Sequence, residues 1–270
     1  MKTLDEIAIN FKTDKSSLNH NYTKLYSIYF DPVRQEKLKI FEIGIDKGFS
    51  LKTWQEYFYN SEITGMDIIN LKHLEKERTH IIQGDQKDKE ILTKINDTYG
   101  PFDIIIDDGS HNDTDVEASF KHLFPLLRPG GIYIVEDLHG CYWERSHRIN
   151  QPVFIDTIKK LIDDINSRGK FGVADIRKDI DDGWYIQKEM PEITWWEKNV
   201  EFLHLYRGIV FIKKYPLEKK LTNIFKHTSV YLTVCPVVPL VKLDYYAKKL
   251  YTKTKNHLKR LLILLTKKHL

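Results

Sequence analysis

Short apolar runs alternate with longer amphipathic segments between residues 38 and 167 of this chain. The apolar runs predict buried strands, which we expect at Leu38–Ile43, Glu62–Asp67, Thr79–Gly84, Phe102–Asp107 and Ile132–Glu136. In the segments between and after these strands, apolar residues recur at the spacing of a helix. We therefore expect helices at Leu51–Tyr59, Lys87–Asn96, Asp113–Leu127 and Val153–Ser167. Strands that alternate with helices predict an α/β fold, with a doubly wound, mostly parallel sheet and right-handed crossovers.

The end of this pattern differs, because two strand-like runs follow each other without a helix. Val200–Leu205 and Ile209–Lys213 are separated only by Tyr206-Arg207-Gly208, which predicts an antiparallel hairpin that closes the sheet. Residues 170–199 before them are interpreted as a loop or lid, or as a small packed subdomain. We therefore divide the chain into an N-terminal cap segment at 1–37, with a helix at Tyr22–Phe30, a main domain at 38–213 and a tail at 214–270.

Charge adds to this picture because it is unevenly distributed. Residues 1–212 carry 28 basic and 36 acidic side chains, a net charge of −8, whereas the remainder carries 14 basic and two acidic ones, a net charge of +12. Apolar residues recur at helical spacing from Ala247 to Leu265 among many lysines, which predicts a basic amphipathic helix. Such a helix favours an anionic membrane surface. Packing on its own domain or on a second subunit is the alternative, and nucleic acid is disfavoured because no aromatic-interleaved motif accompanies the charge.

Composition limits the class of protein. Of 270 residues 41% are apolar and 12% aromatic, which is enough for one α/β domain with a sizeable core. Cys141 and Cys235 lack CxxC spacing and predict no disulfide framework, so a reducing compartment is expected. The N-terminus lacks the apolar stretch of a signal peptide, and no run reaches the roughly 20 apolar residues of a spanning helix. We expect a cytoplasmic protein, either free or peripheral on the inner face of the membrane.

Two acidic clusters carry the candidate chemistry, and each follows an apolar strand. They are Asp107-Asp108-Gly109-Ser110-His111 and Glu136-Asp137-Leu138-His139. Ligands bind at the carboxyl ends of parallel strands, so Asp108, Glu136 and Asp137 would converge there if the strands are neighbours. Converging carboxylates repel one another unless a cation or a proton lies between them. The pattern predicts a site for a hard metal with a nearby base, although the same acids could cap the next helix or form a solvated turn.

A glycine-rich loop follows the first strand. Gly44 and Gly48 allow the backbone to approach a ligand closely before the next helix begins. Asp67 ends the second strand about 20 residues downstream, where an acid commonly accepts hydrogen bonds from ribose hydroxyls. Asp85 ends the third strand, within reach of a nucleotide base. A nucleotide-like ligand is therefore expected, and the alternative is that these acids only cap the following helices.

These motifs resemble the motif series of class I S-adenosylmethionine-dependent methyltransferases, whose fold is Rossmann-like. The resemblance is carried by Glu42-x-Gly44-x-x-x-Gly48-x-Ser50, Gly65-Met66-Asp67-Ile68, Gly84-Asp85-Gln86 and Arg128-Pro129-Gly130-Gly131. The chain resembles more specifically the metal-dependent sugar O-methyltransferases of macrolide biosynthesis, of the mycinamicin and tylosin type. That likeness is carried by Thr13-Asp14-Lys15, His20-x-Tyr22-Thr23 and the two acidic clusters. It covers residues 10–145 well and 145–212 loosely, and it does not cover the tail.

The resemblance implies a role for each candidate residue. S-adenosylmethionine would be bound by Glu42, Gly44, Gly48, Ser50, Asp67, Asp85, Gln86 and Asp107. The metal would be Mg²⁺, with Mn²⁺ or Ca²⁺ as alternatives, bound by the hard oxygens of Asp108, Glu136 and Asp137. His111 would be the general base, with His139 as a supporting or substrate-contacting residue. The resemblance also favours a homo-oligomer.

We therefore expect an enzyme, a Mg²⁺-dependent O-methyltransferase that acts on a sugar hydroxyl of a cell-surface polysaccharide or a glycosylated natural product. One alternative is a hydroxylase related to the cephalosporin hydroxylases. The other is a non-catalytic scaffold that the tail holds at a membrane. Trp143, Trp195 and Trp196 could stack on a sugar ring, although packing in the core is the expected role of any single tryptophan.

Overall fold

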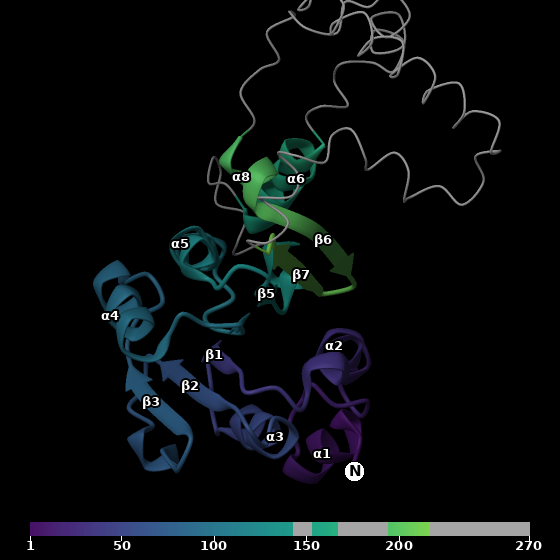
Figure 1. Cartoon of the computed structure of the whole chain (residues 1–270), viewed down its shortest axis with the longest axis vertical. Helices are drawn as coiled ribbons and strands as arrows, with labels where there is room; N and C mark the ends of the chain where they lie inside the picture. Colours follow the sequence, from purple (N-terminus) through teal and green to yellow (C-terminus); the bar gives the residue numbers. More distant parts are fainter. Residues whose placement is uncertain (143–152, 167–193, 217–270) are drawn as a thin grey trace, which may run out of the picture. The chain divides into compact units, whose positions relative to one another are not determined.

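The computed structural model describes residues 1–142, 153–166 and 194–216 (Figure 1). The basic tail, Trp143 and most of the expected loop or lid at 170–199 lie outside these ranges, so the predictions made for them stay predictions. The described ranges all belong to one unit, Met1–Leu217.

A seven-stranded sheet forms the centre of this unit, in the order β3-β2-β1-β4-β5-β7-β6. Its strands are β1 Lys39–Ile43, β2 Glu62–Asp67, β3 Thr79–Gln83, β4 Ile104–Asp107, β5 Ile132–Val135, β6 Val200–Tyr206 and β7 Ile209–Lys214. The first five pair in parallel, and β7 pairs antiparallel with both β5 and β6. The α/β fold, the mostly parallel sheet and the closing hairpin are thus confirmed, with strand ends within two residues of those expected.

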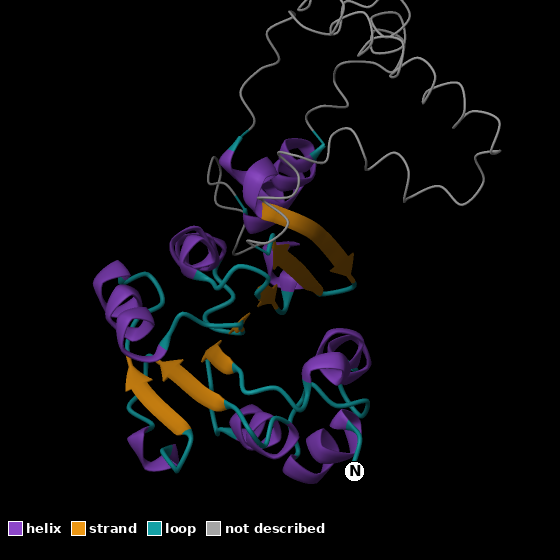
Figure 2. Ribbon diagram, viewed as in Figure 1, coloured by secondary structure: helices purple, strands orange, loops and turns teal. Residues whose placement is uncertain are grey.

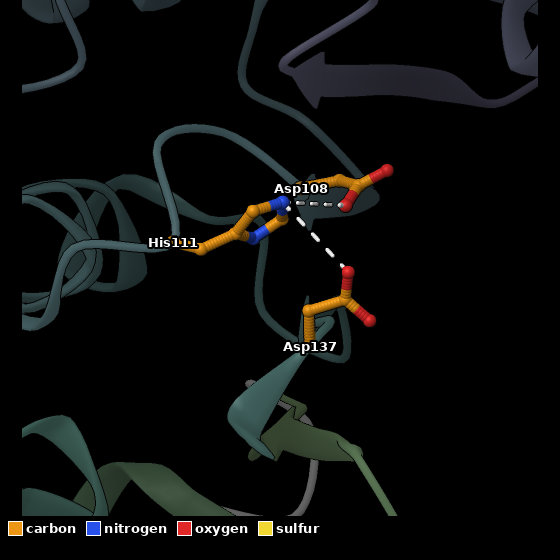
Figure 3. Close-up of side chains that lie close together, drawn as sticks. All are labelled: Asp108, His111 and Asp137. Carbon is orange, nitrogen blue, oxygen red and sulfur yellow. Dashed lines mark ion pairs between the residues drawn. The ribbon is translucent and has the colours of Figure 1, made fainter. Parts of the chain in front are cut away.

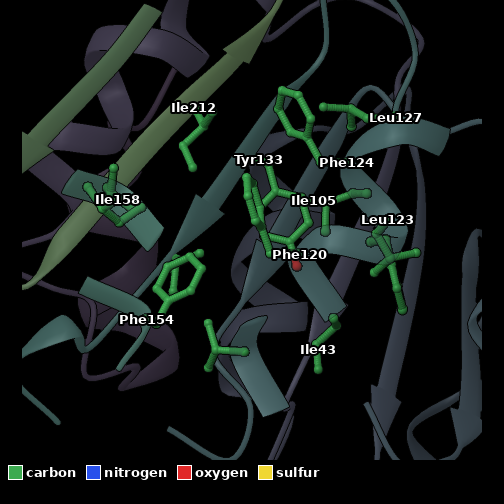
Figure 4. Packing of buried hydrophobic residues seen from close by; sticks show 14 of the residues in the cluster. Ile43, Ile105, Phe120, Leu123, Phe124, Leu127, Tyr133, Phe154, Ile158 and Ile212 are labelled. Atoms are coloured by element: carbon green, nitrogen blue, oxygen red, sulfur yellow. The ribbon is translucent and has the colours of Figure 1, made fainter. Parts of the chain in front are cut away.

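Helices cover both faces of the sheet (Figure 2). They are α1 Leu4–Phe11, α2 Thr23–Phe30, α3 Phe49–Tyr57, α4 Lys89–Tyr99, α5 Asp113–Leu126, α6 Phe154–Ile165 and α8 Trp195–Asn199, with 3₁₀ turns at Asp31–Val33, Lys72–Leu74 and Leu138–Tyr142. Alternate strand residues face opposite ways, as the two-residue period requires. Ile105 and Tyr133 pack with α5 and α6 (Figure 4), whereas Ile104 and Ile106 pack with the other core cluster.

Aromatic rings fill the α5 face of the sheet. The Phe120 ring stacks on Trp196 at 5.4 Å between centroids and meets Tyr133 edge-on at 5.2 Å. The expectation that a tryptophan packs in the core is confirmed for Trp196. This aromatic packing attaches α8 to α5, and antiparallel pairing of β7 with β5 places the hairpin beside β5.

The N-terminal segment holds a helix that the apolar pattern did not predict. Helix α1 begins after Thr3, whose side chain caps the Glu6 N–H while the Glu6 carboxylate accepts from the Thr3 N–H, a capping box. Its buried residues, Leu4, Ile7 and Ala8, have helical spacing. The Thr-x-x-Glu pattern before them is the signal that could have identified this helix.

The loop between α1 and α2 is held by one aspartate. The Asp5 carboxylate accepts from the Ser17 N–H at 2.7 Å, from the Ser17 hydroxyl at 2.6 Å and from the Thr23 hydroxyl at 2.7 Å. These bonds fix the path of residues 12–22, which carry Lys15 and Tyr22. Among the described helices, none combines the length and apolarity needed to cross a bilayer.

Candidate active site

The two acidic clusters lie side by side at the carboxyl edge of the sheet, as expected from the sequence. Asp107 pairs with Ile43 of β1 on one side and with Val135 of β5 on the other. The ladder continues one residue further, because Asp108 N donates to Ile43 O at 2.9 Å and Glu136 N donates to Asp107 O at 3.0 Å. The parallel register therefore brings the acids after β4 and β5 to the same edge.

Asp108, His111 and Asp137 form the closest group of potential metal ligands found within the described ranges. One ligand atom from each lies within 4.8 Å of the others. His111 Nε2 is 3.9 Å from Asp108 Oδ1 and 3.7 Å from Asp137 Oδ2, so the imidazole faces both carboxylates (Figure 3). Two hard oxygens and one imidazole nitrogen meet there, partly open to solvent. This arrangement fits a divalent cation with a base beside it.

His111 and Asp137 share an unusual backbone conformation. Their φ angles are 52° and 53°, in the left-handed region that non-glycine residues seldom adopt. Such strain costs on the order of 1 kcal/mol per residue and persists where the surrounding structure enforces it, often at active sites. Here it turns both side chains toward the same point beyond the ends of β4 and β5.

Lys15 reaches into the carboxylates from the N-terminal segment. Its ammonium donates to Glu136 Oε2 at 2.9 Å and also to Asp108 Oδ2. The side chain is only 2% exposed. Burial by itself lowers the pKa of Lys15, but Asp108 and Glu136 outweigh it and raise that pKa well above its usual value, so the ammonium stays charged.

Glu136 is held by donors from the N-terminal segment. Its carboxylate is buried, and it also accepts from the Tyr26 hydroxyl on α2. Burial and the adjacent Glu136 raise the pKa of Tyr26 far above its usual value, which keeps its hydroxyl protonated as a donor. Of the three predicted metal ligands, Asp108 and Asp137 face His111, whereas Glu136 faces Lys15 and Tyr26.

Two further side chains meet Asp137. The Tyr22 hydroxyl donates to Asp137 Oδ1 at 2.9 Å, and burial together with that carboxylate raises the pKa of Tyr22 strongly. His139 Nδ1 lies 3.8 Å from the same oxygen, and its side chain is about half exposed. Asp137 Oδ2, the oxygen that faces His111, is thus distinct from the one that Tyr22 holds.

A hollow beside this cluster collects several of the predicted cofactor residues. Gly44, Asp67, Asp85 and Gln86 line it, together with neighbours that include Ser110, and it encloses about 200 Å³. Asp67 Oδ2 accepts from the backbone N–H groups of Ile45 and Asp46 at 3.0 and 3.1 Å, which fixes the glycine loop. Gln86 Oε1 accepts from Ser110 N at 2.8 Å and links the third and fourth strand ends.

The glycine loop passes very close to the loop after β4. A Cβ at Gly44, which has φ +81°, would lie 2.1 Å from the Asp108 carbonyl oxygen, so only glycine fits there. Gly48 also has a positive φ and begins α3. This close approach brings the first hollow and the acidic cluster next to each other.

A second hollow lies on the other side of Gly44. Ser50, Lys15, Asp108, His111 and Asp137 are among the residues that line it, and it encloses about 430 Å³. Gly44, Asp67 and Gly109 line both hollows. Five of the eight predicted cofactor residues therefore border these adjoining spaces, together with Asp108, His111 and Asp137, whereas Gly48 lines neither hollow.

Glu42 and Asp107 lie below these hollows and line neither of them. Glu42 is fully buried and accepts from Ser50 Oγ at 2.8 Å and Trp54 Nε1 at 3.1 Å. Burial raises its pKa to about 7. Asp107 is buried too and accepts from the side chains of Ser119, Tyr133 and Gln86, and burial raises its pKa to about 6. In this structure both act as supports beneath the loops.

The three donors from the N-terminal segment were not assigned a role from the sequence. Lys15 and Tyr22 fall within the motifs that carry the family resemblance, and Tyr26 falls within the expected helix. The only indication in the sequence was that Lys15 lies in the part of the chain, residues 1–212, where acidic side chains outnumber basic ones. Its partners lie 93 and 121 residues away, which no local spacing shows.

Comparison with known proteins identifies the domain. Residues 19–138 match the family model described as a methyltransferase domain. The chain is 32% identical to mycinamicin VI 2''-O-methyltransferase of Micromonospora griseorubida, a match that covers 78% of this chain and 52% of that protein. It is also 32% identical to demethylmacrocin O-methyltransferase of Streptomyces fradiae, over 78% of this chain and 53% of the relative.

A solved structure agrees with these matches. The methyltransferase MycE of the mycinamycin biosynthetic pathway, in complex with Mg, SAH and mycinamycin VI, superposes with a TM-score of 0.68 at 32% identity, covering 80% of this chain and 54% of that one. The chain thus spans about half the length of the relatives it matches. Residues 19–138 thus carry a methyltransferase domain, and the described unit is similar in sequence and fold to the macrolide sugar O-methyltransferases.

Proposed function

We propose that this chain transfers a methyl group from S-adenosylmethionine to a sugar hydroxyl, with Mg²⁺ as the metal. The observation that carries the proposal is the group formed by Asp108, His111 and Asp137 beside the hollow lined by Gly44 and Asp67. Related proteins of this fold are named as sugar O-methyltransferases, and MycE was solved with Mg and SAH. Both findings support the same chemistry at the corresponding edge of this sheet.

The cofactor would occupy the first hollow. Asp67 would accept hydrogen bonds from ribose hydroxyls, and Asp85 and Gln86, which line the same hollow, would border the base. Gly44 lets the backbone approach the ligand, and Ser50 lines the adjoining hollow. Glu42 and Asp107 would act indirectly, by holding the glycine loop and the strand ends from below.

Asp108 and Asp137 would hold the metal beside His111, with Glu136 as the third predicted ligand. When bound, S-adenosylmethionine supplies an activated methyl group and Mg²⁺ lowers the pKa of a hydroxyl that it binds. His111 Nε2 would accept the hydroxyl proton as the new carbon–oxygen bond forms. Tyr22 would hold Asp137 in place, and His139 would support the same carboxylate or contact the acceptor.

The acceptor that we favour is a sugar attached to a small natural product. The named relatives act on such sugars, among them a rhamnosyl tetracenomycin. A sugar with two neighbouring hydroxyls could bind one metal ion through both of them. A saccharide of a cell-surface polysaccharide remains the second predicted class of acceptor. Formation of a homo-oligomer and binding of the tail to a membrane also remain predictions.

The experiment that tests this function is a methyl-transfer assay with labelled S-adenosylmethionine and a panel of glycosides that carry vicinal hydroxyls. We expect transfer to at least one glycoside with Mg²⁺ and none with EDTA. Transfer that persists in EDTA would contradict the metal role. A product that gains an oxygen atom in place of a methyl group would instead support the hydroxylase alternative, and no binding of S-adenosylhomocysteine would support the scaffold.

A further inference from the structure

Lys15 lies outside residues 19–138, which match the methyltransferase family model, but its side chain reaches the acidic clusters. Its ammonium lies between Asp108 and Glu136 and is almost completely buried. The Lys15 carbonyl accepts from Thr23 N at 3.0 Å, so the first turn of α2 holds the backbone that delivers this side chain. The ammonium is a fixed part of the site.

The charges of Lys15 and the three nearby carboxylates can be summed. When Asp108, Glu136 and Asp137 are all ionised, they carry three negative charges against the one positive charge of Lys15, a net charge of −2 on the four groups. One divalent cation would neutralise that charge. Without Lys15, two carboxylates would face each other in a buried place with no cation between them, an arrangement that strongly favours protonation or unfolding.

Lys15 also determines which oxygens remain for a cation. It takes Asp108 Oδ2 and Glu136 Oε2, while Asp108 Oδ1 and Asp137 Oδ2 face His111. A cation bound to Asp108 would share a ligand with an ammonium that already has the same sign of charge. Two like charges a few ångströms apart repel each other, and the repulsion is stronger in a protein than in water because the effective dielectric constant is lower.

We propose that Lys15 is the built-in counter-ion of the metal site: it holds Asp108 and Glu136 in place before the cation arrives, and it lowers the affinity of the site for that cation. This inference rests on the proposed metal-dependent function. It makes Lys15 a positioning residue, since its ammonium donates to two carboxylates of the site. The cation would then bind weakly enough to exchange, on a site that is already assembled.

Calorimetric titration with Mg²⁺ tests the proposal without an acceptor. The full chain is titrated in the presence of S-adenosylhomocysteine as wild type, Lys15→Met and Lys15→Gln. Methionine removes the charge at similar length, and glutamine keeps a hydrogen-bond donor that helps the variant fold. We expect Mg²⁺ to bind at least about tenfold more tightly in both variants, because one positive charge has left the site.

Thermal unfolding gives a second readout. In EDTA we expect both Lys15 variants to melt at a lower temperature than the wild type, because the buried carboxylates have lost their counter-ion. Saturating Mg²⁺ should recover most of that loss. The matched control is Lys12→Met: Lys12 is an exposed lysine that lines the same hollow, and its removal should change the Mg²⁺ affinity by only about twofold, because exposed charges are screened.

The outcomes separate this inference from the proposed function. Wild type that binds Mg²⁺, with unchanged or weaker binding in the Lys15 variants, would overturn the counter-ion inference and leave the metal-dependent function standing. Wild type that binds S-adenosylhomocysteine but no Mg²⁺ would overturn the metal role itself. Failure of both variants to fold even in saturating Mg²⁺ would also count against the inference, because a bound cation should replace the ammonium.

Discussion

The carboxyl edge of the sheet and the N-terminal segment contribute opposite chemistry to one site. The sheet edge supplies acceptors, the carboxylates of Asp108, Glu136 and Asp137. The N-terminal segment supplies donors to those carboxylates: Lys15 donates to Asp108 and Glu136, Tyr22 to Asp137 and Tyr26 to Glu136. Strand register positions the acids, whereas the packing of α1 and α2 positions the donors. The difference shows that the sheet alone would present a repulsive cluster of acids, and that the segment before it makes the cluster usable.

Among changes to the carboxylates at the sheet edge, Asp108→Asn should have the largest effect. This change removes the charge of the one carboxylate that contacts both Lys15 and His111. We expect methyl transfer to fall about 10⁴-fold, because the metal loses a charged ligand. The assay is transfer from labelled S-adenosylmethionine at saturating Mg²⁺. Asp97→Asn, on the exposed side of α4, should retain wild-type activity, and an Asp108→Asn enzyme with near-normal activity would contradict the proposed site.

His111→Ala tests the base at the junction of the two regions. We expect a loss of about 10³-fold in kcat, within the range for removal of a general base. Binding of Mg²⁺ and of S-adenosylhomocysteine should change little, since Asp108, Asp137 and the glycine loop remain. The two calorimetric titrations therefore serve as controls. Loss of metal binding together with activity would instead indicate that His111 is a ligand.

Glu42 is a useful contrast, because it is a buried acid within β1 whose hydrogen bonds come from Ser50 and Trp54 of α3. Its pKa is raised from 4.5 to about 7 in the folded protein, so the folded state binds this proton more tightly than the unfolded state. The resulting stability, about 3 kcal/mol, is present below pH 4.5 and is lost as the pH rises to about 7.

Denaturant unfolding at a series of pH values measures this contribution. In Glu42→Gln the dependence of the free energy of unfolding on pH between 4.5 and 7 should become flatter, whereas Glu77→Gln, at an exposed position, should retain the wild-type dependence. Equal slopes in the wild type and Glu42→Gln would show that Glu42 does not titrate in this range.

Tyr22→Phe makes the smallest change to the donor side. It removes the hydroxyl that donates to Asp137 and leaves the ring. We expect a loss of about 1 kcal/mol in stability and a weaker affinity for Mg²⁺, about fivefold, because Asp137 becomes less fixed. Tyr29→Phe is the matched control: its hydroxyl meets His204 and Tyr206 away from the cluster, so stability should fall by a similar amount with no change in Mg²⁺ affinity.

The sequence predicts the sheet edge better than it predicts the N-terminal segment. The strands, the hairpin and the meeting of Asp108 with Asp137 were predicted, because a parallel register brings successive strand ends to one edge. The sequence did not show that Lys15 pairs with Glu136, since that contact depends on how the N-terminal segment packs over 121 residues of separation. The sequence also did not predict the left-handed backbone conformation at His111 and Asp137, because neither residue is a glycine.

Binding of one metal ion by Asp108 and Asp137 at the carboxyl edge of the sheet is the central claim, and a crystal structure with S-adenosylhomocysteine and Mn²⁺ tests it most directly. Mn²⁺ gives an anomalous signal and prefers the same oxygen ligands as Mg²⁺. We predict an anomalous peak within about 2.2 Å of carboxylate oxygens of Asp108 and Asp137. Clear density for S-adenosylhomocysteine with no peak at these carboxylates, or with a peak elsewhere in the molecule, would contradict it.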